Sequence, residues 1–472
     1  MLNEYVALFP EIIITIGILL MGLIKLFNRD ATPKTFYNLS RFFMIFGLFA
    51  AAVFYNQNVG AYLYNNMFTI LFKILIYAFT FVWSYLSFKH FAGKNVSGFA
   101  FYETLLFNLL GFSIAISAHN LLLLFIGLSS QFLANNVLLR IEKNNNDNFY
   151  VRSFLWLSLF FTAVFGLGIA IMYYYTRTFD YDAIERILAV RSQIIWQYQM
   201  AFICVMVALL FMLGVAPLHF WYAGIVSKSI LPVGGYLTIV PIFAYFACLV
   251  NVCVNAFYPL LGWFNLVFIV FGLLSILFGA IGANSEINVR KIFAYSGLYY
   301  IGVTILTLFP LTDQNLVAAF TYLLVYVVAM CGIYTVFYGY RSKGVYMSEL
   351  DDIKGVATQR PFLSAALLIF MISLIGTPPL LGFLGKLSVI NSLVIGHHFV
   401  LIGVELLTML VLVYAYLKII MAIYFDHRYN IFDTVDKGVY ICLLINIILI
   451  LFAIINPKYL MHDVELMLVE VF

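Results

Sequence analysis

Charged residues are scarce in this sequence. Among its 472 residues there are 25 Lys and Arg and 21 Asp and Glu, so that charged side chains make up 10% of the chain. In soluble proteins the charged share is about a quarter, because the surface of a folded body this large has to be hydrated. The scarcity excludes a soluble enzyme, a disordered tail and a nucleic-acid binder.

Motifs for cofactor chemistry are also missing. The sequence has no Gly-rich loop for a phosphate, no cysteine cluster for an iron–sulfur centre and no pair of histidines with haem spacing on facing apolar helices. His397 and His398 lie in a connection without a third metal ligand nearby, and a wet loop is the expected setting. The cysteines lie in apolar runs and are expected to be small buried hydrophobes; they are Cys204, Cys248, Cys253, Cys331 and Cys442.

Long hydrophobic runs dominate what is present. The chain is 64% hydrophobic and its mean hydropathy is +1.03. A helix that crosses a bilayer needs roughly 20 mostly apolar residues. The runs are hydrophobic all round, which favours helices over the alternating segments of a β-barrel. The sequence therefore predicts an all-α polytopic membrane protein with about fourteen transmembrane helices, near 5–26, 40–56, 66–88, 98–117, 120–140, 151–175, 197–220, 229–253, 258–283, 290–309, 314–338, 362–384, 400–425 and 437–456.

Basic residues are unevenly shared between the connections. With fourteen spans, one set of loops holds most of them, as at Arg290-Lys291 and at Arg341 and Lys343, whereas the other set has few. The positive-inside rule places the basic loops on the cytoplasmic or matrix side. One miscounted span would destroy this asymmetry, so its regularity supports the count.

Two runs carry proline and glycine deep inside an apolar stretch. The seventh run is predicted to break at Pro217, and the twelfth at Pro378-Pro379, shortly before Gly382. Proline removes a backbone donor and clashes with the preceding turn. At membrane depth the freed carbonyls are tolerated only where protein or water satisfies them. Residues 384–400 could continue the twelfth helix after its break.

The positions of the breaks suggest an internal repeat. They lie five helices apart, so the two broken helices run in opposite directions, as in an inverted repeat that surrounds a transport site. Two unrelated proline kinks are the alternative. The predicted division is an N-terminal three-helix segment at 1–97, a first repeat at 98–256, a second repeat at 257–425, and a C-terminal helix and tail at 426–472.

Few ionisable residues lie inside the apolar runs, and each is a candidate for a proton pathway because burial of a charge in a bilayer is costly. Lys386, just after the second break, is the strongest candidate. His219 follows Pro217, and a structural histidine is the competing interpretation. Snorkelling to the surface competes for Lys73 and Lys418. Helix capping competes for Glu103, and the remaining candidate is Glu405, near the outer end of its helix.

The breaks and their flanks resemble the antiporter-like subunits of respiratory complex I, the proton-pumping NADH:quinone oxidoreductase. The resemblance covers nearly the whole chain and rests on five segments. These are Leu8-Phe-Pro10-Glu11-Ile, Pro217-Leu-His219-Phe-Trp221, Ile292-Phe-Ala294-Tyr295-Ser296, Tyr322-Leu-Leu-Val-Tyr326 and the run from Gly376 to Lys386. A double proline followed by Gly-Lys resembles subunit 2 in particular.

The resemblance implies roles for some residues and also reveals departures. It makes Lys386 the lysine of the distal half-channel and places His219 at the first break. The family's glutamate in a Gly-Leu-Glu context is Ser129 in this chain, and its two lysines of the first repeat align with Met212 and Ile242. The first repeat is therefore expected to be proton-silent, which means that it conducts no protons. The chain is expected to be a divergent member of the family.

The expected function is that of a membrane-arm subunit of complex I that contributes to proton translocation through the Lys386 half. FMN, iron–sulfur clusters and ubiquinone are expected on partner subunits, with no cofactor in this chain. The expected partners are the other membrane-arm subunits and the lipid bilayer, without nucleic acid. The inner mitochondrial membrane is the expected location, with a bacterial plasma membrane as the alternative. An independent cation/proton antiporter and a transport-silent structural subunit are the competing functions.

Overall fold

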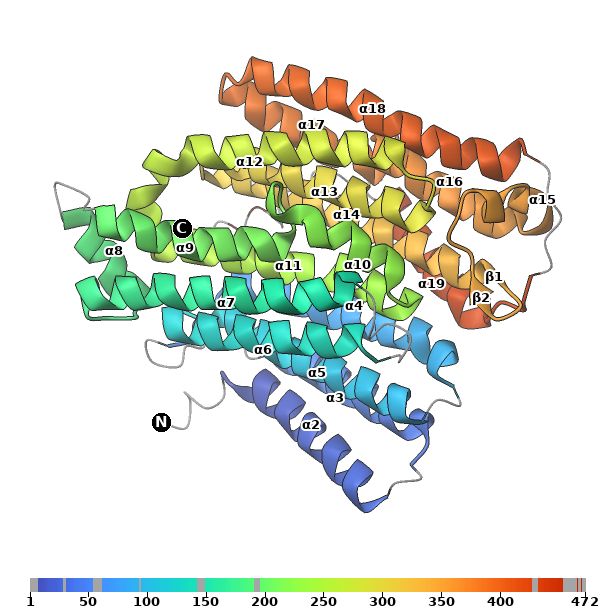
Figure 1. The fold of residues 1–472 in the computed structure, drawn as a ribbon, viewed down its shortest axis with the longest axis horizontal. Helices are drawn as coiled ribbons and strands as arrows, with labels where there is room; N and C mark the ends of the chain where they lie inside the picture. The colour runs from blue at the N-terminus through green and yellow to red at the C-terminus, as the bar shows by residue number, and fades with distance from the viewer. Residues whose placement is uncertain are drawn as a thin grey trace. The chain divides into compact units, whose positions relative to one another are not determined.

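The computed structural model is a bundle of helices (Figure 1). It describes residues 7–28, 31–53, 62–92, 95–141, 149–190, 196–426 and 432–452, together with Glu465 and Leu468. The predicted all-α membrane fold is confirmed. The helices are α2 (Phe9–Phe27), α3 (Pro33–Val53), α4 (Met67–Phe91), α5 (Asn95–Ser117), α6 (Leu121–Leu139), α7 (Phe149–Thr176), α8 (Tyr181–Val190), α9 (Trp196–Leu213), η2 (Leu218–Trp221), α10 (Tyr222–Lys228), α11 (Leu231–Asn255), α12 (Tyr258–Ser285), α13 (Val289–Leu308), α14 (Asp313–Gly339), η3 (Asp351–Ile353), α15 (Val356–Gln359), α16 (Pro361–Ile375), α17 (Leu381–Ile395), α18 (Phe399–Tyr424) and α19 (Lys437–Phe452).

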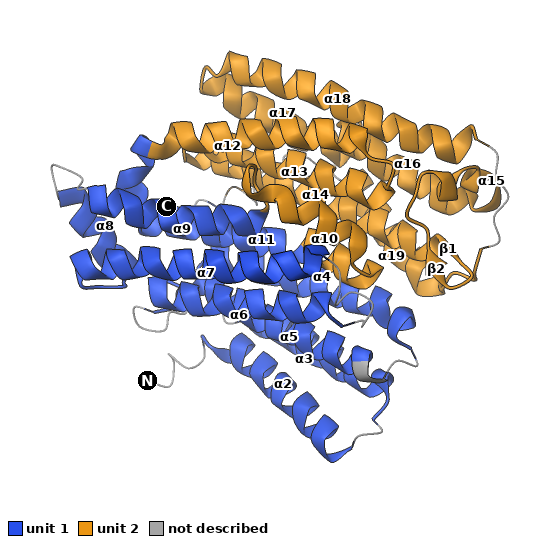
Figure 2. Ribbon diagram, in the orientation of Figure 1, with its two compact units in different colours: residues 1–213, 240–263, 467–472 blue, residues 214–239, 264–466 orange. Residues whose placement is uncertain are grey.

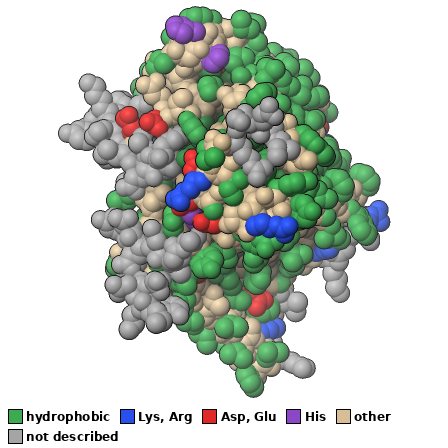
Figure 3. Space-filling view, turned by 90° about the vertical axis from the view of Figure 1, so that its left-hand side faces the viewer, with side chains coloured by type: hydrophobic (Ala, Val, Ile, Leu, Met, Phe, Trp, Pro, Cys, Tyr) green, Lys and Arg blue, Asp and Glu red, His purple; other side chains and the backbone are tan. Residues whose placement is uncertain are grey.

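Each of the fourteen predicted runs forms helix. Twelve helices of the described chain are long and apolar enough to cross a membrane, while the twelfth run consists of the shorter α16 and α17 and the last run is α19. Large apolar side chains point outward along many helices, including Leu19, Trp156 and Leu410, which are 62%, 68% and 67% exposed. Such outward-pointing apolar side chains along the helices suit contact with lipid. Figure 3 views the protein from the left-hand side of Figure 1, toward the ends of the helices, and shows hydrophobic side chains mixed with other types, with few charged side chains.

Both predicted breaks are present, and they are built alike. The helix before each break ends at a glycine with positive φ, Gly214 (φ 74°) after α9 and Gly376 (φ 80°) after α16. Glycine adopts this left-handed conformation without steric cost, and it is a common helix terminator. A shorter helical segment follows each break, η2 with α10 in one case and α17 in the other. The continuation of the twelfth helix beyond residue 384 is thereby confirmed.

The chain divides into two compact units (Figure 2). Unit 1 comprises residues 1–213, 240–263 and 467–472, and unit 2 comprises residues 214–239 and 264–466. The first boundary falls at Gly214, where the break begins. The predicted division of the chain at residues 97, 256 and 425 stays a prediction, because two compact units do not by themselves test for an internal repeat.

Several elements were not predicted. The region 177–196 was treated as a connection, but it contains α8, which buries Tyr181, Ile184 and Leu188 along one face. Residues 339–361 lie between two predicted runs, and they contain an antiparallel pair of short strands, β1 (Arg341–Ser342) and β2 (Val345–Tyr346), followed by η3 and α15. A search for apolar runs long enough to cross a membrane finds neither region, because both are too short and too polar.

Two interpretations of single residues are wrong. Helix capping, the competing interpretation of Glu103, does not hold, because α5 begins at Asn95 and Glu103 lies more than two turns beyond that start. Cys204 is partly exposed, in contrast to the other four cysteines, which are buried as expected. The first error arose because α5 starts in a polar stretch that the apolar-run criterion had assigned to a loop.

Candidate functional site at the α16–α17 break

The break between α16 and α17 exposes two adjacent backbone carbonyls. The last carbonyls of a helix have no partner within it and must find donors elsewhere. The Nζ atom of Lys386 donates a hydrogen bond to the carbonyl of Ile375 at 3.0 Å, and the hydroxyl of Tyr300, on α13, donates to the carbonyl of Leu374. The half-buried lysine and the buried tyrosine are therefore held at neighbouring peptides of one helix end.

Two glycines make this arrangement possible. A Cβ atom at Gly382 would lie 1.6 Å from the carbonyl oxygen of Ser373, so only glycine allows α17 to start this close to α16. A Cβ atom at Gly376 would lie 3.2–3.4 Å from the last atoms of the Lys386 side chain, which runs over that glycine. The glycines expected to mark the break thus also set the position of the lysine.

A substitution at Gly382 tests this packing. We expect Gly382→Ala to lower the stability of the folded subunit by about 1–3 kcal/mol, because the backbone of α17 must move away from Ser373. The melting temperature of the assembled protein in membranes or detergent measures the effect. Gly403→Ala on α18 is the matched control, because a Cβ atom there meets nothing within 4 Å. Equal melting temperatures for the two variants would contradict the predicted close contact.

Glu405 is the acidic group of the site. Its side chain is 0% exposed on α18, and the hydroxyl of Tyr299 donates to its backbone carbonyl at 3.1 Å and to its Oε1 atom at 3.3 Å. Its charge attracts that of Lys386 although the two form no direct ion pair among the described residues. The Oε2 atom is buried without a hydrogen-bond partner in the same part of the chain. Lys386 and Tyr300 are thus bonded at the break itself, and Tyr299, the neighbour of Tyr300 in the sequence, is bonded to Glu405.

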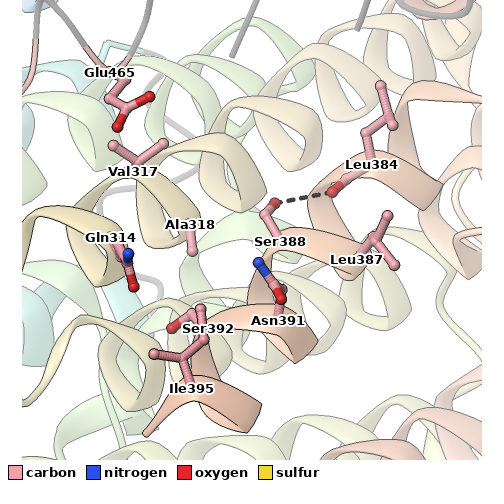
Figure 4. Close-up of a pocket in the computed structure, with 10 residues that line it drawn as sticks. All are labelled: Gln314, Val317, Ala318, Leu384, Leu387, Ser388, Asn391, Ser392, Ile395 and Glu465. Carbon is pink, nitrogen blue, oxygen red and sulfur yellow. Dashed lines mark hydrogen bonds between the residues drawn. The ribbon is translucent and has the colours of Figure 1, made fainter. Parts of the chain in front are cut away.

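Another face of α17 borders a cavity of about 520 Å³ (Figure 4). Its lining includes the amide side chains of Gln314 and Asn391, and Ser388, whose hydroxyl donates to the carbonyl of Leu384 at 2.9 Å. The lining residues of α17 recur every three or four positions and therefore lie on one face of the helix. Lys386 is not among them. The cavity and the lysine site thus use different faces of the same helix.

The other two candidates of unit 2 lie apart from this site. The ring of His219 is half-buried and packs near Phe278 with 5.1 Å between centroids, and its Nδ1 atom has no hydrogen-bond partner among the described residues. The Nζ atom of Lys418 donates to the carbonyl of Asn284, near the end of α12, at 2.6 Å. A cation that satisfies the last carbonyls of a helix has a sufficient structural role. Neither residue is bonded to Lys386 in the described chain.

Unit 1 contains a buried ion pair. Lys73 on α4 binds the Oε1 atom of Glu11 on α2 at 2.8 Å and the Oδ1 atom of Asn65 at 2.8 Å, and both charged residues are almost fully buried. Ser113 and Ser117 on α5 donate to the same two acceptors at 2.5 and 2.9 Å. Lys73 therefore does not snorkel, because its ammonium lies in the interior with a partner. Glu103, on the same unit, is half-buried and forms no ion pair among the described residues.

The positions where the family resemblance implied charged residues are occupied by neutral side chains in the interior. Met212 and Ile242 are both 3% exposed, and the Oγ atom of Ser129 is buried without a partner in the described chain. Nearby on α6 and α11, Tyr245 donates to Gln131 and accepts from the Nδ2 atom of Asn135 at 3.4 Å. This part of unit 1 has polar groups but no charge.

Sequence reasoning missed three members of these clusters. Glu11 was quoted as part of a motif but was not proposed as a site residue, although it is a carboxylate within an apolar run. Tyr299 and Tyr300 gave no signal, because tyrosine is common in buried helices and its hydroxyl becomes informative only when its partner is known. Among the described residues no group of three or more metal-ligating side chains occurs.

Comparison with known proteins identifies the family of the chain. Residues 118–412 match the family described as NADH:quinone oxidoreductase/Mrp antiporter, transmembrane. The match spans well over half of the chain, and the chain therefore belongs to this family. The predicted resemblance to antiporter-like subunits is confirmed.

Several curated relatives are bacterial proteins named NADH-quinone oxidoreductase subunit N. The chain is 28% identical over 438 residues to that of Sphingopyxis alaskensis, with 91% of each protein covered. It is 26% identical over 467 residues to that of Ruthia magnifica, with 96% of this chain and 95% of the relative covered. The name subunit 2, which the double-proline motif suggested, is not used by these relatives.

Solved structures share the fold. One chain of respiratory complex I from Thermus thermophilus with bound aureothin superposes with a TM-score of 0.80 at 21% identity, covering 96% of this chain and 98% of that one. A chain of the Mrp complex from Dietzia sp. DQ12-45-1b gives a TM-score of 0.83 at 16% identity, covering 100% and 98%. At these identities the likeness concerns the fold.

Proposed function

We propose that this chain is a membrane subunit of a proton-pumping NADH:quinone oxidoreductase and that it carries no redox centre itself. The relatives named subunit N, aligned over nearly the full length, support the assignment to this complex. The observation that carries the transport role is the hydrogen bond of Lys386 to a carbonyl freed by the α16–α17 break, together with the interaction of its charge with the buried Glu405 of α18. A half-buried amine at a broken helix is suited to accept and release protons.

The proposed proton route uses the Lys386 half alone. In unit 1 the residues Ser129, Met212 and Ile242 provide no group that can hold a charge, so the first repeat is proposed to be proton-silent. Lys73 is proposed to have a structural role in its ion pair with Glu11. His219, Glu103 and Lys418 remain secondary candidates for the proton pathway. The interaction between the charges of Lys386 and Glu405 supports the choice of this half.

Partners and location follow from the same assignment. The other membrane subunits of the complex are proposed as direct partners, while FMN, iron–sulfur clusters and ubiquinone are proposed to bind elsewhere in the complex. Because the relatives are bacterial, we favour the bacterial plasma membrane over the inner mitochondrial membrane.

Native purification tests the assignment. The chain is expected to co-migrate with subunits that contain flavin and iron–sulfur clusters, and the purified complex is expected to take up protons as it oxidises NADH. A free homo-oligomer that exchanges cations for protons without NADH would instead establish an independent antiporter. The neutral residues Ser129, Met212 and Ile242 in the first repeat disfavour that alternative, since an antiporter is expected to retain a carboxylate–lysine set there.

A further inference from the structure

Unit 2 contains a cluster of buried tyrosines that the proposed function has not used. Five of them extend from the α16–α17 break through the interior of the unit and are at most 4% exposed; they are Tyr222, Tyr300, Tyr322, Tyr326 and Tyr334. A phenol buried at membrane depth is expected to find a partner for its hydroxyl. In the described chain the hydroxyls of Tyr222, Tyr322 and Tyr326 have no complete hydrogen bond. Packing alone would be served equally well by phenylalanine, which is abundant in this sequence.

The cluster begins at the lysine site. The hydroxyl of Tyr300 is bonded to the carbonyl of Leu374, next to the carbonyl that binds Lys386. The rings of Tyr322 and Tyr326, on α14, both stack with Tyr300, with centroid distances of 4.8 and 4.9 Å and interplanar angles of 20° and 23°. The hydroxyls of Tyr300 and Tyr322 also interact electrostatically. The lysine site is therefore continuous with α14 through neighbouring phenols.

The hydroxyls of Tyr326 and Tyr222 come together beside Gly297 on α13. A Cβ atom at Gly297 would lie 2.4 Å from the hydroxyl oxygen of Tyr326 and 3.1 Å from that of Tyr222. The two oxygens thus converge on one point of α13 that carries no side chain. The two hydroxyls interact with each other without a complete hydrogen bond among the described residues.

The far end of the cluster reaches a buried cation. Tyr222 interacts with Tyr334, and the hydroxyl of Tyr334 in turn interacts with Thr238 and with the charge of Arg290. Arg290 is 8% exposed at the start of α13, and its guanidinium donates to the carbonyl of Ser229 at 3.3 Å. Arg290 belongs to the basic connection that the positive-inside rule assigns to the cytoplasmic side. The cluster therefore extends from the break toward that side of the membrane.

We propose that Tyr334, Tyr222, Tyr326, Tyr322 and Tyr300 form a hydroxyl relay that carries protons between the cytoplasmic end of unit 2 and Lys386. This inference rests on the proposed function of Lys386 and supplies the route to it. In each step a phenol accepts a proton on a lone pair of its oxygen and releases its own proton to the next acceptor, directly or through a bridging water. The phenol is neutral before and after, and its hydroxyl must rotate before the next transfer. No oxidant or reductant takes part.

Replacement of single tyrosines by phenylalanine tests the relay, because it removes the hydroxyl and keeps the ring. The assembled complex in closed membrane vesicles is assayed for protons taken up per NADH oxidised and for the rate of quinone reduction. Tyr326→Phe and Tyr222→Phe are expected to lower the proton-to-electron ratio as far as Lys386→Ala does. Combination of Tyr326→Phe with Lys386→Ala is expected to lower it no further, because both changes block one route.

Tyr340→Phe is the matched control. Its hydroxyl is also buried in unit 2, where it is bonded to Ser364 at 3.1 Å, and it has no part in the cluster. This variant is expected to retain the full ratio, and native gels check that all variants assemble equally. Full ratios in Tyr326→Phe and Tyr222→Phe, with a reduced ratio in Lys386→Ala, would overturn the relay and leave the proposed function intact. A full ratio in Lys386→Ala would overturn both.

Discussion

Lys386→Ala is expected to slow proton passage through this subunit by about 100-fold, the usual loss when a positioned proton carrier is removed. The reason is that Lys386 holds an ionisable amine at the carbonyl of Ile375, where its charge interacts with that of Glu405. In the assembled complex the loss is measured as fewer protons taken up per NADH oxidised, while the complex still assembles. The hydrogen bond to Ile375 contributes little by comparison, since that carbonyl can bind water instead.

The matched variant separates charge from proton exchange. Lys386→Arg keeps a cation at the break but cannot release its proton, because a guanidinium remains protonated in proteins. It is therefore expected to reduce the ratio as much as Lys386→Ala. If only the alanine variant reduced the ratio, the lysine would act as a fixed charge. If neither did, the subunit would be a structural member of the complex and the assignment of transport to this residue would be wrong.

Lys73→Met is expected to destabilise unit 1 by about 3–5 kcal/mol, because it leaves the carboxylate of Glu11 buried without its cation. Both groups are removed from solvent, and Asn65 and Ser113 cannot replace the lost charge. The effect is measured as a lower melting temperature and a smaller amount of subunit in the membrane. A surface ion pair would show a far smaller effect, of about 1 kcal/mol or less.

A double variant and a control define the test. Glu11→Gln combined with Lys73→Met removes both charges and is expected to regain part of the lost stability, since an isolated buried charge is costlier than a neutral pair. Lys418→Met is the control, because that lysine is only partly buried and is bonded to a carbonyl. If the double variant were as unstable as Lys73→Met, the desolvated charge of Glu11 would not be the cause.

The fold could be predicted from the sequence because a bilayer imposes one length on every crossing. The fourteen apolar runs coincide with helices, and proline with glycine marked both interruptions, at Pro217 and at Pro378-Pro379. By contrast, α8 escaped the same criterion, because its ten residues are amphipathic and too few to cross. Its buried positions at 181, 184 and 188 have helical spacing that a search for short surface helices would have found.

The site was predicted only in part. Lys386 and Glu405 stood out as charges in apolar surroundings, and the structure brings them to one break. The pairing of Glu11 with Lys73 could not be predicted, because 62 residues separate them and no local pattern joins them. Tyr300 was equally hidden, since its role depends on a carbonyl freed 74 residues further along. Contacts at such sequence separations arise from helix packing, which hydrophobic periodicity does not specify.

The two adjacent carbonyls at the end of α16 have a mechanical consequence. Because Leu374 and Ile375 belong to the same rigid helix end, a tilt of α16 displaces the anchors of Tyr300 and Lys386 together and leaves their separation unchanged. A rotation of α16 about its own axis acts differently, since successive carbonyl oxygens lie about 100° apart around that axis. It would move the two anchors in different lateral directions relative to Tyr300 and Lys386. The two hydrogen bonds therefore respond alike to a shift of α16 and unequally to its rotation.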